Sequence, residues 1–565
     1  MRPDETKIPR RQAGFRPFLP VLVLAALIPL ARPAHAAEKS DLQSWALDLP
    51  GPPAAVVPAD LNGDRVTDLV IALAFNQWDE IAVTESSQME GIDELVEVMT
   101  VVPYLLDRRE ARAYLGKPDG GFAPAGPALP LPLSVLSMEA GPPGTPVVVL
   151  TDEGASALRL DSSGALKLEP LISDPPVFAG SGNFLPDLGL VRDLDGDGVL
   201  DLLLPARDGL AVYLAGPDGL SRTAASRLPL PGEDYQANEG LRRIYPLPVV
   251  TDVDGDRKPD LVFKDPKKSW RHVRVMRNAG GGRFLPVFDA VREEEKKEKE
   301  KTDEKQEPTS DVVWLGDLDG DGLGELVTQT EIEPEKDGVR AEMKQARENH
   351  GRVHLRHLDR ELAPSQDVYH SFETVGYGFE SQDTEFNLPG GFQDLNGDGR
   401  RDLVLVTIDI TIMKALGVLA TKRLNLGLDF QVWCQGERGG FRKVGGLDLS
   451  GQFRINLNDL RVRDMSLFAG DFNGDGRADF VQLGRGKNVT VHYGGQDCSF
   501  PKQPDRKIRL EAEPRDLSLV RIRDFNGDGR SDLLVVHPRS TKDRDPGLAP
   551  PVRMEFHLSG KGDSK

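Results

Sequence analysis

The sequence has 565 residues, a net charge of −20 and two cysteines, and these figures exclude several classes of protein. So negative a chain does not suit the binding of nucleic acid phosphates. Two cysteines are too few for a small scaffold held together by disulfides. A chain of this length could hold several domains, although one large ring of repeats fits equally well.

The first 36 residues have the features of a secretory signal peptide. A basic segment ending at Arg16 precedes the apolar stretch 19–30, and the small residues of 34–36 form a cleavage site. Twin-arginine export through Arg10-Arg11 is an alternative, although the residues that follow fit its motif poorly. The apolar stretch is too short and too rich in proline to anchor the chain in a membrane. We therefore expect export to the periplasm, the cell surface or the medium, and no transmembrane segment after cleavage.

A nine-residue acidic segment occurs seven times along the chain. The copy that begins at Asp394 reads Asp-Leu-Asn-Gly-Asp-Gly-Arg-Arg-Asp and runs into the apolar stretch 403–406. Carboxylate or amide oxygens at positions one, three, five and nine can converge on one point, and the carbonyl at position seven can complete the shell. Such hard ligands suit Ca²⁺, or less well Mg²⁺. Position twelve is Leu405 rather than the glutamate of an EF-hand, so we predict calcium loops of a β protein.

The seven copies predict up to seven bound Ca²⁺ ions. Their starts are 133, 59, 65, 77, 77 and 53 residues apart, and periods of this length are typical of a propeller or another array of repeats. The predicted metal ligands, in chain order, are Asp60, Asn62, Asp64, Val66, Asp68, Asp193, Asp195, Asp197, Val199, Asp201, Asp252, Asp254, Asp256, Lys258, Asp260, Asp317, Asp319, Asp321, Leu323, Glu325, Asp394, Asn396, Asp398, Arg400, Asp402, Asp471, Asn473, Asp475, Arg477, Asp479, Asp524, Asn526, Asp528, Arg530 and Asp532.

The segments around the first loop predict the strands of one repeat. A strand at 54–57 enters the loop and a second strand leaves it at 68–74. An insertion at 75–110 follows, and then a third strand and a glycine-rich turn at 113–122. Later repeats keep this order, with insertions between the second and third strands at 331–350 and 407–428. These insertions are expected to be helical or irregular.

The 133-residue interval after the first loop hides an eighth unit that has lost its ligands. Within residues 125–175, strands are predicted at 133–138 and 147–150, and the segment between them, 140–146, contains no acidic residue. A highly charged segment at 292–308 lies between two repeats and reads as a solvated linker.

Repeated four-stranded antiparallel sheets predict an all-β fold, a β-propeller, because packing such sheets in a ring buries both faces of each one. We expect eight blades over residues 37–565. Seven blades is the alternative, with residues 125–175 only decorating a neighbour. The last unit supplies three strands, and Trp45–Leu49 is an outer strand without a blade of its own. Pairing the two would close the ring and cover exposed sheet edges.

These loops and turns resemble the FG-GAP or VCBS repeat family, which includes the calcium-binding propeller blades of integrin α-subunits. The metal loop is the specific part of the match. The Phe-Gly and Gly-Ala-Pro signatures are kept only loosely, as in residues 121–124. The resemblance implies a secreted or surface propeller with Ca²⁺ in its loops, and it does not imply one activity.

Motifs of catalysis are nearly absent from the sequence. It has no His-Glu-x-x-His segment and no Gly-x-Ser-x-Gly segment. His350, His354 and His357 lie close together in sequence, but the last two would point to opposite faces of a strand, which argues against a zinc site. We therefore expect a monomeric, non-catalytic binding or adhesion module for an unidentified protein or glycan.

The alternative function is a calcium-dependent carbohydrate-active enzyme, because some polysaccharide lyases resemble this fold and motif. Such an enzyme needs a basic side chain beside a metal, and Arg277 and His354 are candidates.

Two further expectations concern single sites. Cys434 and Cys498 fall in neighbouring repeats, and export makes a disulfide between them possible without fixing it. The loop at Asp193, with four carboxylates and two glycines, is predicted to bind Ca²⁺ among the more tightly. The loop at Asp252 is predicted to bind more weakly, because Arg257 replaces its second glycine and adds positive charge.

Overall fold

A computed structural model describes the chain between residues 42 and 559, all within one compact unit at 39–565. The longest gaps are 77–105, 290–309, 333–343, 379–390, 410–422 and 539–551. The predicted signal peptide and charged linker therefore lie outside the described residues. The named elements are all β-strands. Over the described ranges, no helix is both long enough and apolar enough to cross a membrane.

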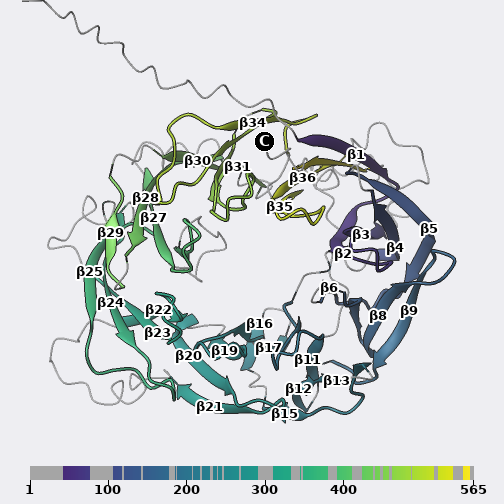
Figure 1. Cartoon of the computed structure of the whole chain (residues 1–565), viewed down its shortest axis with the longest axis horizontal. Helices are drawn as coiled ribbons and strands as arrows, with labels where there is room; N and C mark the ends of the chain where they lie inside the picture. The colour runs from purple at the N-terminus through teal and green to yellow at the C-terminus, as the bar shows by residue number, and fades with distance from the viewer. Residues whose placement is uncertain are drawn as a thin grey trace, which may run out of the picture. The chain divides into compact units, whose positions relative to one another are not determined.

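Eight antiparallel blades of four strands stand side by side in a ring, as Figure 1 shows; six are separate sheets, and the other two belong to one nine-stranded sheet. Blades one to four contain β2 (Pro53–Ala59), β3 (Asp68–Asn76), β4 (Leu106–Gly116) and β5 (Phe122–Leu131); β6 (Ser137–Ala140), β7 (Val147–Thr151), β8 (Gly154–Leu160) and β9 (Leu166–Ile172); β10 (Val191–Arg192), β11 (Asp201–Ala206), β12 (Gly209–Tyr213) and β15 (Ser226–Leu228); β18 (Val249–Thr251), β19 (Asp260–Asp265), β20 (Ser269–Asn278) and β21 (Phe284–Asp289).

Blades five to eight continue in chain order. They contain β22 (Ser310–Gly316), β23 (Glu325–Glu331), β24 (His350–His357) and β25 (His370–Val375); β26 (Gly391–Gln393), β27 (Asp402–Asp409), β28 (Arg423–Gln435) and β29 (Phe441–Lys443); β31 (Arg461–Phe468), β32 (Phe480–Leu483), β33 (Asn488–His492) and β34 (Arg506–Arg509); β35 (Val520–Arg523), β36 (Asp532–Pro538), β37 (Val552–Leu558) and β1 (Gln43–Leu49). The eight-bladed propeller is therefore confirmed, and the unit without an acidic loop forms blade two.

The second strand of each blade contains a run of buried apolar residues, because both of its faces lie between blades. In β3, Leu69, Ile71 and Leu73 pack against blade eight. The alternate residues Val70 and Ala72 pack against blade two. Because side chains alternate between the two faces of a strand, this one short segment contributes to the hydrophobic cores on both sides of blade one. The hydrophobic core of the protein is a series of such layers between neighbouring blades.

Four additional pairings lie outside the blades. The first part of β28 pairs with β30 (Ser450–Asn456), and β30 pairs with β31, so blades six and seven share one hydrogen-bonded sheet. Two short ribbons also occur, β13 (Ala215–Gly216) with β14 (Gly219–Leu220), and β16 (Glu233–Ala237) with β17 (Gly240–Ile244). The sequence did not predict any of these pairings.

The ring closes through the pairing of β1 with β37, as predicted. Seven residue pairs join the two strands, from Gln43 opposite Leu558 to Leu49 opposite Val552. The Trp45 ring packs between blades one and eight, with its centroid 5.1 Å from that of Phe556. Both ends of the described chain therefore lie in blade eight.

A buried polar network reinforces this closure. The carboxylate of Glu555 on β37 lies 2.7 Å from the His537 ring nitrogen Nε2 and 2.8 Å from that of His557, and it accepts the Glu511 backbone N–H at 2.9 Å. Burial alone would raise the pKa of Glu555, but the two histidine contacts outweigh it and lower that pKa to about 2. The Glu511 carboxylate in turn pairs with Arg553. The network joins blade seven to blade eight through charges rather than apolar contacts.

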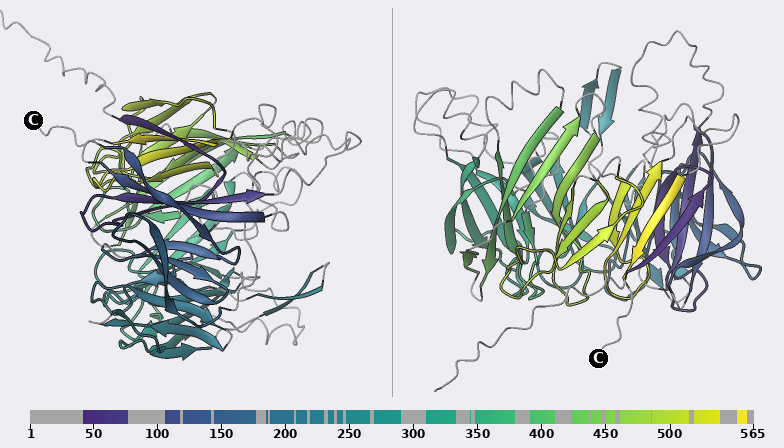
Figure 2. Two further views of the ribbon diagram at one scale, coloured as in Figure 1. Left: turned by 90° about the vertical axis from the view of Figure 1, so that its right-hand side faces the viewer. Right: turned by 90° about the horizontal axis from the view of Figure 1, so that it is seen from above.

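The two faces of the ring carry different connections. The acidic loops all join a first strand to a second, so they share one face with the turns between third and fourth strands. The ends of β3, β23 and β27, where each second strand continues toward the third, lie at the opposite face (Figure 2). The β16–β17 ribbon, which joins blades three and four, stands away from the ring on that same face.

Candidate metal centres

All seven acidic loops fold in the same way, held by their own carboxylates. In each loop the position-one carboxylate accepts the backbone N–H groups of positions four and six, at 2.6–3.1 Å. The side chain at position five accepts the N–H of position seven. These bonds wrap the backbone around the acidic side chains, so that the spaced acidic residues of each loop surround one centre.

Position six needs a positive φ angle, and two loops meet this need without glycine. Arg65 in blade one has a φ of 67° and Arg257 in blade four has a φ of 68°. A non-glycine residue in this region carries backbone strain of roughly 1 kcal/mol. This strain adds a physical reason for the weaker binding predicted for the blade-four loop, and it extends the same expectation to blade one.

The carboxylate at position nine is fully buried in every loop and ties the loop to its blade. It accepts the N–H of position two at 2.7–3.0 Å. In six blades its other oxygen accepts an N–H at or just beyond the end of the third strand, at 2.6–3.1 Å. Those donors are Gly116, Ala215, Asn278, Gln435, Gly494 and Ser559. The same acid thus fixes the loop, the second strand and the third strand.

Burial makes these position-nine charges costly in the absence of a cation. It raises the pKa of Asp201, Asp260 and Asp402 to about 6, and that of Asp479 and Asp532 to about 7, although two backbone N–H groups oppose the shift in each case. Neighbouring loop carboxylates raise these pKa values further. A divalent cation at the centre of the loop would offset both the burial and the repulsion.

The pH dependence of the metal-free protein should therefore run opposite to that of most proteins. The unfolded carboxyls titrate near pH 4, whereas these folded ones hold their protons up to about pH 6–7. Stability from this source is complete below pH 4 and is lost as the pH rises through 7. In EDTA, we expect the melting temperature to decrease as the pH is raised from 5 to 8. In excess Ca²⁺, it should not decrease over this range. A metal-free melting temperature that rises over this range would contradict the assignment.

The loop geometry fits a calcium ion. Ca²⁺ binds oxygen at 2.3–2.6 Å, so ligand atoms on opposite sides of one ion are at most about 5 Å apart. Three loops bring three carboxylate atoms within 4.8 Å of one another, namely those of blade three (Asp193, Asp195, Asp197), blade four (Asp252, Asp254, Asp260) and blade five (Asp317, Asp319, Glu325). The loops of blades one, six, seven and eight have asparagine at position three and therefore one carboxylate fewer.

The blade-eight loop adds an orphaned ligand atom. The Asn526 amide donates to the Ser559 carbonyl at 2.8 Å rather than to its loop neighbour. The Asp528 oxygen Oδ2 is left buried with no hydrogen-bond partner among the described residues. A buried, unpartnered carboxylate oxygen costs several kcal/mol unless something compensates for it. A bound cation is the simplest such group.

Blades six and seven carry a competing positive charge inside the loop. Arg400 pairs with Asp398, and Arg477 pairs with Asp475, at positions seven and five of their loops. In blade four, Lys258 makes the corresponding contact with its position-five acid at 3.2 Å. A cation that enters these loops must displace an internal ion pair, so their affinity should be lower than that of blade three.

Beside the blade-five loop lie His357 and Tyr369, a pair that sequence reasoning did not connect with this loop. Its position-nine residue is Glu325, and the longer side chain reaches His357, whose Nδ1 lies 3.2 Å from Oε1. The His357 ring stacks on Tyr369 with centroids 4.0 Å apart. The Tyr369 hydroxyl is buried without a partner in the described structure, and burial followed by the charge of Glu325 raises its pKa. The one sequence signal was the glutamate where six other loops have aspartate.

Of the two basic candidates chosen from sequence, Arg277 lies near an acidic loop, because its charge opposes the rise in the pKa of Asp254 in blade four. His350, His354 and His357 each have a different partner, Glu348, Ser371 and Glu325, so their ring nitrogens do not gather around one point. Arg277 donates to a backbone carbonyl in blade five at 2.6 Å.

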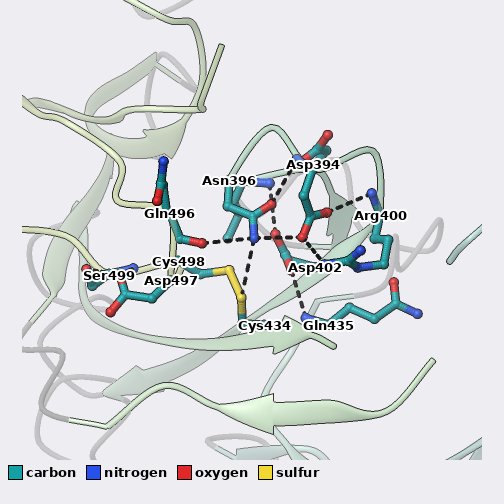
Figure 3. The surroundings of a disulfide bond; sticks show 12 residues. Asp394, Asn396, Arg400, Asp402, Cys434, Gln435, Gln496, Asp497, Cys498 and Ser499 are labelled. Carbon is teal, nitrogen blue, oxygen red and sulfur yellow. Dashed lines mark hydrogen bonds and ion pairs between the residues drawn. A yellow bond between two sulfur atoms is a disulfide. The ribbon is translucent and has the colours of Figure 1, made fainter. Parts of the chain in front are cut away.

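Cys434 and Cys498 form a disulfide between blades six and seven, with their Cα atoms 5.9 Å apart (Figure 3). The bond holds the turn of blade seven against the blade-six loop. There the Asn396 amide, at loop position three, donates to the Gln496 carbonyl at 3.2 Å and lies 3.7 Å from the Cys434 sulfur. The disulfide therefore sits beside a candidate ligand as well as between two blades.

Replacing both cysteines with serine should lower the melting temperature markedly. The bond closes a loop with a sequence separation of 64 residues, and constraining such a loop in the unfolded chain contributes about 4 kcal/mol. Thermal unfolding of the oxidised protein and of the double variant Cys434→Ser/Cys498→Ser, both in excess Ca²⁺, measures the effect. Equal melting temperatures would show that the bond does not stabilise the ring.

An eight-bladed β-propeller with an acidic loop in seven blades is the class of protein that this fold and these sites define. The model of the FG-GAP-like repeat matches residues 471–535, which span the loops of blades seven and eight. Together with the eight blades, this match fits an FG-GAP β-propeller repeat family, as the sequence predicted.

Two other comparisons add little. No curated protein sequence matches the chain significantly. Among solved structures, a protein from Lactobacillus plantarum is 11% identical, with a TM-score of 0.28, covering 72% of this chain and 93% of its own. A score this low supports no argument about fold or function.

Proposed function

We propose that this protein is an exported, calcium-stabilised propeller that acts as an interaction module without catalysis of its own. The observation that carries the proposal is the sevenfold repetition of one loop geometry, each copy ending in a fully buried carboxylate that ties two strands together. A catalytic acid is needed once, whereas a structural ion can fasten each blade that has such a loop. Repetition therefore favours ions that fasten the blades.

The same arrangement favours the opposite face for partner binding. The cation loops and short turns occupy one face, and the strand ends that carry the long connections occupy the other. Connections that vary in length on a rigid scaffold are where recognition usually lies. We propose a protein or glycan ligand there. A glycan array combined with a pull-down from envelope extract would identify it, and disruption of the metal loops alone should not remove binding sites on that face.

Calcium titration tests the metal sites directly. The variant Asp197→Ala in blade three removes the position-five ligand from a loop with four carboxylates, so the number of bound Ca²⁺ ions should fall by one. Equilibrium dialysis followed by metal analysis counts the ions. Asp208→Ala, at an exposed acid that pairs with Arg227 in the same blade, is the matched control and should leave the count unchanged. Loss of no ion from Asp197→Ala would refute the blade-three site.

A second candidate function is calcium-dependent action on a carbohydrate, and blade five supplies the observation in its favour. His357 and Tyr369 stack beside three converging carboxylates, and these are groups that can exchange protons with a substrate. Tyr369→Phe and His357→Ala should then abolish cleavage of any glycan that the protein binds, while His354→Ala on the same strand should not. Bound glycan that stays intact with the wild-type protein would exclude this candidate.

A further inference from the structure

The acidic loops of neighbouring blades contact one another as well as their own strands. In the middle of the chain the contact is a backbone hydrogen bond from position eight of one loop to position two of the loop before it. Arg401 donates to the Leu318 carbonyl at 2.8 Å, and Ala478 donates to the Leu395 carbonyl at 3.1 Å. These bonds join the loops of blades five, six and seven in series.

The link from blade seven to blade eight is double. Position eight of the blade-eight loop is Ser531, whose N–H donates to the Asp471 carbonyl at 2.7 Å. Its hydroxyl oxygen accepts the Asp471 N–H at 2.9 Å. Asp471 is position one of the preceding loop, so a ligand residue itself is held by the next blade.

Blade four keeps the link by another route. Position eight of its loop is Pro259, which has no N–H to donate. The buried Asn278 side chain takes over, because its amide donates to the Leu194 carbonyl of the blade-three loop at 2.7 Å and to the Pro259 carbonyl at 3.1 Å. The Asn278 backbone N–H also binds the position-nine acid Asp260. One residue therefore joins two loops and a ligand.

Two remaining junctions are close contacts. A Cβ atom at Gly324, position eight of the blade-five loop, would overlap the Val253 carbonyl of the blade-four loop. A Cβ atom at Gly527 in blade eight would overlap the Thr67 hydroxyl of blade one. Blade two has no acidic loop, so the series runs from blade three through blade eight to blade one and has two ends.

We propose that these contacts couple the loops into one cooperative cation-binding array, in which an ion in one loop raises the affinity of the next. This inference rests on the proposed calcium binding. In blades five and six, the position-two residue donates its N–H to the position-nine carboxylate of its own loop, and its carbonyl accepts an N–H from the next loop. The donor of this bond lies at position eight of the next loop, one residue before the position-nine acid of that loop. Ordering one loop around its ion therefore orders the donor that its neighbour needs.

One substitution can remove a single link between loops by using a residue that another blade already has at the same position. Arg401→Pro in blade six deletes the N–H that reaches Leu318 and installs the residue that blade four already tolerates at this position. Blade six has Gln435 where blade four has Asn278, and both side-chain atoms of its amide lack a partner in the described residues. Adding Gln435→Asn should recreate the blade-four bridge and restore the link.

Calcium binding is measured by isothermal titration on the full chain after removal of metal, with the number of bound ions counted independently. We expect a Hill coefficient above one for the wild-type protein. Arg401→Pro should keep all ions but split the titration into two phases, with the weaker phase shifted by about 5- to 150-fold. The double variant with Gln435→Asn should return toward one phase. Asn488→Ala, an exposed residue at the start of β33, serves as the control and should not change the curve.

Three results would overturn the inference. A Hill coefficient of one with all ions bound would show that the loops are not coupled, and it would leave the proposed calcium function intact. An unchanged curve for Arg401→Pro would show that the link carries no coupling. Binding of no calcium would overturn both proposals. If Arg401→Pro does not fold, Asn278→Ala tests the junction between blades three and four with the same titration, where loss of the bridge should separate the two sites.

Discussion

EDTA should lower the melting temperature of this protein by a large amount, and excess Ca²⁺ should restore it. Each loop packs three or four carboxylates around one point, and the one at position nine is fully buried. Without a cation their repulsion opposes the turn that joins two strands. Each site that is 100-fold above its Kd stabilises the folded state by about 2.7 kcal/mol, and extracellular modules bind at roughly 10⁻⁴–10⁻³ M. Several such sites together exceed the stability of a typical domain.

Differential scanning calorimetry on a sample verified to be metal-free measures this effect. Mg²⁺ should restore less stability than Ca²⁺, because its smaller octahedral shell suits an irregular oxygen cage poorly. The disulfide should be kept intact in both samples so that only the ions differ. Melting that is identical with and without EDTA would show that the loops hold their shape unaided.

Deletion of residues 43–49 should abolish cooperative unfolding of the whole ring. This segment is β1, which supplies the fourth strand of blade eight through seven residue pairs with β37. Its removal exposes the edge of β37, uncovers the buried Met554 and Phe556, and leaves an open sheet edge that invites aggregation. Leu49→Ala, at one buried side chain of the same strand, should cost about 2–5 kcal/mol and serve as the milder test.

Truncation before residue 42 is the matched control, since it leaves β1 complete. Thermal unfolding followed by circular dichroism, together with gel filtration, separates loss of closure from general instability. A protein that lacks 43–49 but still melts in one sharp transition as a monomer would exclude closure as the source of cooperativity.

Sequence reasoning reached the blades because two periodic signals coincide in each of them. An acidic loop fixes where a hairpin turns, and the buried run after it, as at 403–406, fixes the second strand. The blade without ligands could still be found because its strands 147–151 and 154–160 keep the apolar pattern. The start of its first strand was predicted four residues too early, at 133 instead of Ser137, because Val135 is buried but lies in the turn before β6.

Contacts between blades were beyond the reach of sequence. The bridge at Asn278 depends on a proline 19 residues earlier and on a carbonyl in another blade, and no spacing rule joins the three. The stacked pair His357 and Tyr369 is brought together by the strand pairing of blade five. For the cysteines, neighbouring repeats made a bond possible, but only the packing of a turn against β28 brought the sulfurs together.

The closure of the ring also sets the order in which the chain can fold. Residue 43 pairs with residue 558, so β1, the first strand of the described residues, waits for β37, the last of them. Blades one to seven draw their strands from contiguous segments and can assemble as they appear. Until β37 has been synthesised, β1 has no partner strand. Contacts between residues so distant in sequence form slowly. Blade eight is therefore the last to form, and the interval before its completion is when this protein is most exposed to misassembly with a second copy of itself.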